Sequence, residues 1–171
     1  MAYFGLYQRP TLLNVIQSEP FVIGIFAGMS KPTSAADYLS DFVAEATSLQ
    51  IHGFLMSDVF VFFDVHSIVC DAPARAFLKN IKSFTGYHGC ERCIQPGQYY
   101  CGRMTFLDSN STLRTNESFI GMDDEDHHLS DVPSALTQVS VGMVTGFVLA
   151  CYMHLVWYAC MALCLVGGSR E

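Results

Sequence analysis

Charged residues are scarce in this chain, and positive charge is the scarcer sign. Only 15% of the residues are charged, 9 Lys and Arg stand against 16 Asp and Glu, and the formal net charge is -7. This balance argues against a protein that coats nucleic acid nonspecifically, because such binding comes from many Lys and Arg contacts with phosphate. Apolar residues make up 51% of the chain, so it can form a packed core and extended disorder is not expected.

From these residues we expect neither a secretory signal peptide nor a regular disulfide framework. Residues 1–20 contain no basic stretch followed by a long apolar one. The seven cysteines are odd in number and are not spaced as paired half-cystines. Reduced thiols in an intracellular compartment are therefore the preferred interpretation. The sequons at Asn110 and Asn116 would matter only if the chain enters the secretory route.

The few positive charges are concentrated rather than spread. Five of the nine basic residues fall within one short segment: Arg75, Lys79, Lys82, Arg92 and Arg103. On a helix, Arg75, Lys79 and Lys82 share one face, so this segment predicts a short amphipathic helix with a basic outer side. That side is a candidate DNA-binding surface, although three charges more commonly form a solvated helix face. The acidic residues 123–128 (DDEDHH) predict a solvated loop rather than a metal site.

Three apolar runs have the composition of strands. Residues 12–16 and 21–26 suit two strands, and the second has the continuous apolar character of a strand covered on both faces. Residues 59–70 are rich in Val and Phe and predict a further buried strand.

A well-delimited helix is expected between these runs. Ser34 is a good N-cap, with Asp37 three residues later, and His52-Gly53 ends the pattern. Between them, apolar residues recur at helical spacing from Tyr38 to Leu49. Strands that alternate with helices predict an α/β fold, with a mixed sheet and flanking helices.

Asp71 and a Cys-x-x-Cys pair follow the last of these strands. An acid at the end of a buried strand is a possible catalytic group, but an Asp before Ala-Pro is also an ordinary helix N-cap. A lone pair such as Cys90 and Cys93 is redox-active, metal-binding or incidental.

Residues 139–166 contain no Asp, Glu, Lys or Arg. The segment is long enough to cross a bilayer, which takes about 20 apolar residues. Two interpretations stay open: a transmembrane helix, or a fully buried core helix with one polar site around Cys151 and His154.

Several longer phrases carry a specific resemblance: PFVIGIFAGMSKPTSAADYLSDFV, VCDAPARAFLKNIKSFTGYHGCERC, GRMTF, LRTNESF and CYMHLV. In their order and spacing they resemble a transposase-derived family of animal genomes, the transposase domain-containing proteins. This family is similar to the CACTA, Mirage and Chapaev group of cut-and-paste DNA transposases. The resemblance runs from about Tyr3 to about Trp157.

The resemblance implies an RNase H-like core, in which three acids hold two Mg²⁺ or Mn²⁺ ions for phosphoryl transfer. Asp71 falls in the place of the second acid. The first acid is expected before Tyr3, and the third, a Glu, well after His154. One acid cannot hold two metals, so we expect no DNA cleavage or strand transfer by this chain alone.

The resemblance also implies a zinc site. The family carries an insertion after the second acid, with a CxxC and a later C/DxxH, which correspond here to Cys90, Cys93, Cys151 and His154. Three sulfurs and one imidazole suit tetrahedral zinc. The alternative is four unrelated buried side chains.

Together these expectations describe an α/β protein in three parts. Residues 1–84 are a partial RNase H-like core, residues 85–138 a zinc-knuckle and polar loop insertion, and residues 139–171 an apolar helical segment. The expected function is an inactive fragment of a DNA transposase-like protein with structural zinc, nuclear or nucleocytoplasmic, without a small-molecule substrate. The alternatives are a domesticated DNA- or protein-binding module and a membrane protein anchored by residues 139–166.

Overall fold

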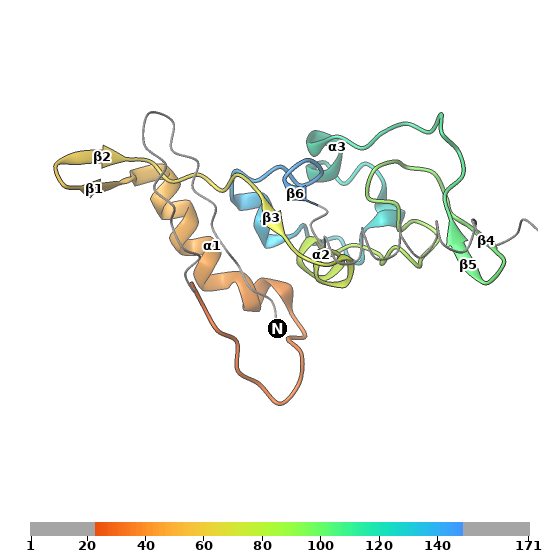
Figure 1. Ribbon diagram of the computed structural model, residues 1–171, viewed down its shortest axis with the longest axis horizontal. Helices are drawn as coiled ribbons and strands as arrows, with labels where there is room; N and C mark the ends of the chain where they lie inside the picture. Colours follow the sequence, from red (N-terminus) through yellow and green to blue (C-terminus); the bar gives the residue numbers. More distant parts are fainter. Residues whose placement is uncertain (1–22, 149–171) are drawn as a thin grey trace, which may run out of the picture.

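The computed structural model describes residues 23–148 (Figure 1). The fold is mixed α/β, as predicted, but its sheets are small. The elements in chain order are α1 (Ala35–His52), β1 (Phe54–Met56), β2 (Val59–Val61), β3 (Ile68–Val69), α2 (Ala72–Lys79), β4 (Gln98–Tyr100), β5 (Arg103–Thr105), α3 (Asn116–Ile120), two 3-10 turns (Glu125–His127 and Ala135–Gln138) and β6 (Phe147–Val148).

The strands of residues 23–148 form three separate pairs. Strands β1 and β2 form one antiparallel pair, β4 and β5 another, and β3 and β6 pair in parallel. The two hairpins lie at opposite ends of the elongated molecule (Figure 1).

Helix α1 confirms the prediction made from its cap and its apolar stripe. The Ser34 side chain accepts a hydrogen bond from the Asp37 backbone nitrogen at 3.1 Å, which satisfies a donor that the first helical turn leaves unpaired. Leu39, Val43 and Ala46 are buried, and the acidic side of the helix stays in solvent. Gly53 ends the helix with a positive φ of 62°, a conformation that glycine adopts without steric cost.

The prediction of one continuous buried strand over residues 59–70 is wrong. Its first residues, Val59–Val61, form the return strand of a hairpin with Phe54–Met56. Both hairpin strands are largely exposed. Ser57 and Asp58, with φ of 48° and 65°, make the two-residue turn, and left-handed conformations at both positions are typical of tight hairpins. Only the later part of the run reaches the core, where Val65 and Ile68 are buried; the apolar residues of the hairpin stay exposed.

Residues 23–26, the described part of the predicted strand 21–26, are not a strand either. They have no regular structure, and Ile25 is 77% exposed instead of being covered on both faces. The Phe26 ring packs edge-on against Tyr38 of α1, with ring centres 5.8 Å apart. A strand requires a neighbouring strand to satisfy its backbone groups, and residues 23–26 have none among the described residues. The other predicted strand, at residues 12–16, lies outside these residues.

The buried core joins α1 and α2 to a segment that the sequence presented as helical. Residues 139–148 instead form turns that lead into β6. Their apolar side chains pack with those of the two helices, together with Leu136 from the preceding 3-10 turn: Val139, Val141, Met143, Val144 and Phe147. The lack of charge in residues 139–148 thus reflects burial in the core. The remainder of the predicted apolar helix, including Cys151 and His154, lies outside the described residues. Within residues 23–148, no helix is long and apolar enough to cross a membrane.

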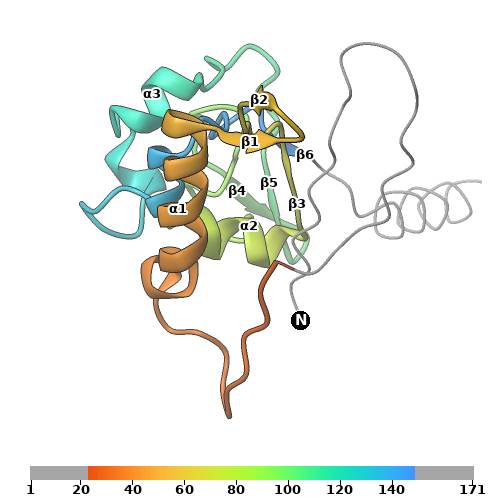
Figure 2. The same cartoon turned by 90° about the vertical axis from the view of Figure 1, so that its left-hand side faces the viewer.

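Strand β3 leads into the part of the chain that carries the candidate residues. It pairs with β6, where Ile68 lies opposite Phe147, and the Ile68 nitrogen donates to the Gly146 carbonyl at 2.8 Å. Helix α2 begins directly after β3 and packs on the same core as α1, as the view along the molecule shows (Figure 2). A long connection follows α2, which we call the excursion (residues 80–146). It carries the cysteines and ends in β6. The excursion is therefore anchored at both ends by the β3–β6 pair.

Candidate metal centre

Asp71 lies between β3 and α2 and caps the helix. Its side-chain oxygen accepts a hydrogen bond from the Ala74 backbone nitrogen at 2.8 Å, and the carboxylate is exposed. Among residues 23–148, no group of three or more His, Cys, Asp or Glu side chains is placed to hold a metal ion. Within the described part of the chain Asp71 is therefore not a member of such a group, and the role that its contacts show is that of an N-cap.

Cys90 and Cys93 come together at the turn of a loop that we call the knuckle (residues 86–95). Their sulfur atoms lie 3.0 Å apart. Cys93 is buried and Cys90 is half-buried. Behind them the chain pairs with residues 112–114: the Ile94 nitrogen donates to the Thr112 carbonyl at 3.1 Å, and the Arg114 nitrogen donates to the Arg92 carbonyl at 2.9 Å. This backbone pairing thus holds the two cysteines where their sulfur atoms lie close together.

Two converging cysteine sulfurs fit half of a tetrahedral zinc site. Zinc–sulfur bonds of about 2.3 Å place two thiolates roughly 3.8 Å apart on one ion, so the pair must open by less than about 1 Å to share a metal. The other predicted ligands, Cys151 and His154, lie outside the described residues. Cys101, in contrast, is exposed at the turn between β4 and β5.

Glu91, between the two cysteines, holds the knuckle against α2. Its carboxylate accepts hydrogen bonds from Arg75 Nε at 3.0 Å and from Lys79 Nζ at 2.9 Å. Burial raises the pKa of the Glu91 carboxyl, but the adjacent Lys79 and Arg75 lower it by more. The pKa of Glu91 therefore lies below its usual value. One carboxylate thus balances two cations from the helix.

This arrangement corrects the predicted basic outer side of α2. Arg75 is only 6% exposed and Lys79 only 1%. The Lys79 ammonium also lies 5.2 Å from the ring centres of Phe119 and Phe147. Lys82 alone of the three stays at the surface, 3.8 Å from Asp126. Two of the three side chains proposed for phosphate binding are therefore turned inward, because Glu91 lies on the inner side of the helix.

Two arginines fix the rest of the knuckle. Arg92 donates to the Val144 carbonyl at 3.0 Å, which ties the loop to the segment that leads into β6. Arg114 donates to the Cys90 carbonyl at 3.0 Å and pairs with Asp124 at 2.6 Å. Neither contact was foreseen from the sequence, because no local pattern indicates which carbonyl oxygen a distant arginine reaches.

The two thiols differ electrostatically. Burial and the hydrogen bond with Cys93 raise the pKa of Cys90. Burial acts in the same direction on Cys93, but hydrogen bonds from Cys90, Gln95 and Ser111 outweigh it and lower the pKa of Cys93. Cys93 is thus the better stabilised thiolate. The Cys70 thiol, by comparison, has a pKa raised by burial to about 11, which does not favour reactivity.

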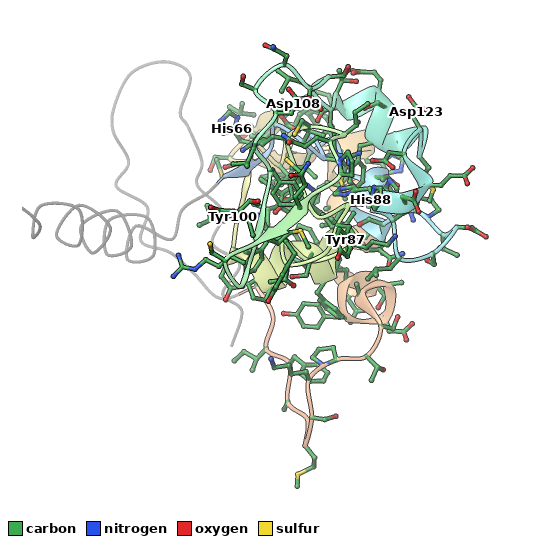
Figure 3. The ribbon with its side chains drawn as sticks, turned by 90° about the vertical axis from the view of Figure 1, so that its right-hand side faces the viewer. His66, Tyr87, His88, Tyr100, Asp108 and Asp123 are labelled. Atoms are coloured by element: carbon green, nitrogen blue, oxygen red, sulfur yellow. The ribbon has the colours of Figure 1, made fainter. Side chains whose placement is uncertain are left out.

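The acidic loop at residues 123–128 is solvated only in part. Asp123, Glu125 and Asp126 are exposed, but His127 and His128 are buried. His127 Nδ1 donates to the His88 carbonyl at 2.7 Å, and its Nε2 is buried without a partner among the described residues. Burial, aided by Arg114, His128 and Lys79, lowers the pKa of His127 to about 4. His88, two residues before Cys90, is labelled together with Asp123 in Figure 3.

Comparison of the chain with family models, with curated proteins and with solved structures gave no match.

Proposed function

We propose that this chain is the part of a DNA transposase-like protein that carries the second catalytic acid and a structural zinc knuckle, and that it is inactive by itself. The observation that carries the proposal is the convergence of Cys90 and Cys93, with sulfurs 3.0 Å apart, on a loop that follows the β3–Asp71–α2 unit. In the RNase H-like arrangement that the sequence resembles, this unit is the fourth strand, the second acid and the following helix.

The site favours structural over catalytic zinc. Cys90, Cys93, Cys151 and His154 would hold the ion, and four protein ligands leave no open position for a substrate. The knuckle is also fixed by the ion pairs of Glu91, by the hydrogen bond from the Arg114 side chain to the Cys90 carbonyl and by backbone pairing with residues 112–114, as expected of a clip that closes a long excursion of the chain.

The residues present do not fit a two-metal catalytic centre. Such a centre requires several carboxylates around the reacting phosphate, and among residues 23–148 Asp71 belongs to no group of three or more His, Cys, Asp or Glu side chains that could hold a metal ion. Asp71 therefore serves here as a helix cap. We infer from this donor set that Mg²⁺ or Mn²⁺ will not support DNA cleavage by this chain.

Metal content after purification under reducing conditions tests the proposal. We expect about one zinc per chain, lost in Cys90→Ser, Cys93→Ser and His154→Ala. Cys101→Ser is the matched control, because Cys101 is an exposed cysteine of the same segment, and it should keep the metal. A wild-type chain that takes up no zinc, or serine variants that retain it, would contradict the proposal.

A nuclease assay on supercoiled plasmid with Mg²⁺ or Mn²⁺ tests the second part of the proposal, that the chain by itself does not cleave DNA. No cleavage above background is expected from the wild type or from Asp71→Asn. Cleavage by the wild type that disappears in Asp71→Asn would overturn the assignment of an inactive fragment.

A further inference from the structure

The side chain of Gln95 links the knuckle to a distant part of the excursion and points one N–H group at a cysteine sulfur. Its Nε2 donates to Cys93 Sγ at 3.0 Å and to the Asp108 carbonyl at 3.0 Å. Its Oε1 accepts from the Asp108 backbone nitrogen at 2.9 Å. Both amide hydrogens and the amide oxygen of Gln95 are therefore engaged.

These contacts fix which way the amide is turned. Asp108 offers one donor and one acceptor, and only the observed orientation matches both of them. A flipped amide would place oxygen against the Asp108 carbonyl and nitrogen against its N–H group. The backbone of Asp108 thus ensures that an N–H group, and not an oxygen, faces the sulfur of Cys93.

An N–H group held on a sulfur atom is useful when that sulfur carries negative charge. Hydrogen bonds to an ionised acceptor are roughly twice as strong as those between neutral groups, and zinc binds cysteine as the thiolate. Partners of this kind orient the ligand and typically change metal affinity by about 10- to 100-fold when they are removed.

We propose that Gln95 is a positioning residue of the zinc site, which holds Cys93 in place through an N–H···S hydrogen bond. This inference rests on the proposed zinc site at Cys90 and Cys93. Gln95 acts through Cys93 and does not itself bind the metal.

The test compares Gln95→Glu and Gln95→Leu in the full chain. The glutamate can still accept from the Asp108 nitrogen, but it turns an oxygen toward Cys93 and the Asp108 carbonyl. The leucine keeps a similar volume and removes every hydrogen bond. Thr105→Val is the matched control, because it deletes the hydrogen bond from Thr105 Oγ1 to the Gln98 carbonyl in the neighbouring hairpin and leaves the sulfur untouched.

Zinc affinity is measured by chelator competition, and the cobalt-loaded protein is examined for its thiolate-to-metal charge-transfer band. Both Gln95 variants should bind zinc about 10- to 100-fold more weakly. Their band should move to lower energy, because a thiolate without its hydrogen bond donates electrons more readily. Thr105→Val should match the wild type in both measurements.

The outcomes separate this inference from the proposed function. A wild type that binds zinc, with Gln95 variants of equal affinity and unchanged band, would overturn the role of Gln95 alone. Weaker binding with an unchanged band would also overturn it, because it would indicate general destabilisation. A wild type that binds neither zinc nor cobalt would overturn both proposals.

Discussion

Lys79 is one of the most deeply buried side chains of the described structure, and its ammonium nitrogen lies 2.9 Å from the carboxylate of Glu91. Burial lowers the pKa of Lys79, and the charge of Glu91 partly restores it. A buried charge is tolerated only when it is paired. The position of the knuckle on α2 is therefore tied to the charge of Lys79.

Replacement of Glu91 by Gln should be strongly destabilising. The change removes the carboxylate and leaves Arg75 and Lys79 buried without a counter-charge, which typically costs about 3–5 kcal/mol. Because Glu91 itself is partly accessible, we expect the lower end of that range. Urea denaturation measures the loss. Glu45→Gln on the exposed side of α1 is the control and should change stability by no more than about 0.5 kcal/mol. Equal stability of the two variants would contradict the prediction.

Stability should fall as the solution becomes mildly acidic. The pKa of His127 is about 4 in the folded chain, below its usual value of 6.5, so the unfolded chain binds the proton more readily. The contribution of the neutral imidazole is complete above pH 6.5 and is lost progressively as pH falls toward 4, by about 2 kcal/mol at pH 4.5. Urea midpoints between pH 7.5 and 4.5 measure this slope.

A variant that does not titrate tests the assignment to His127. His127→Gln should be less stable at neutral pH, because it disturbs a buried site, but its stability should depend less on pH. His66→Gln is the control, since His66 is exposed, and it should keep the slope of the wild type. An unchanged slope in His127→Gln would show that other groups cause the acid sensitivity.

Substitutions at Asp71 distinguish a helix cap from a metal-binding acid. Asp71→Ala should cost about 1 kcal/mol, because the Ala74 nitrogen loses its acceptor. Asp71→Ser should be nearly as stable as the wild type, since serine is also a good N-cap. Thermal denaturation provides the comparison. Equal losses in both variants would indicate that the carboxylate has a role beyond capping.

The β1–β2 hairpin should tolerate polar residues far better than the core does. Leu55 and Phe60 face each other across the hairpin and are 67% and 55% exposed. Leu55→Ser and Phe60→Ser should each cost no more than about 0.5 kcal/mol, whereas Leu39→Ala in the core should cost about 2–5 kcal/mol. The double hairpin variant should also self-associate less in sedimentation velocity, because exposed apolar patches promote association. Losses as large as that of Leu39→Ala would indicate that the hairpin is buried in solution.

Helix α1 was predictable because its signals are local. Ser34, Asp37 and Gly53 mark its ends, and the buried positions recur at helical spacing between them. The strand at residues 59–70 was not predictable in the same way. Apolar composition indicates which residues avoid water, but a strand also needs a neighbouring strand to pair with. The partner of β3 is β6, which lies near the other end of the described chain.

The sequence by itself determined the capped helix α1, the position of Asp71 at the start of α2, and the close approach of two cysteines three residues apart. Each of these depends on neighbours within one or two turns of chain. Only the tertiary structure decided that Arg75 and Lys79 point inward, that Gln95 reaches Asp108, and that His127 is buried. The physical reason is that a charge or an amide is placed by the partner it finds across the fold, and the local pattern does not specify that partner.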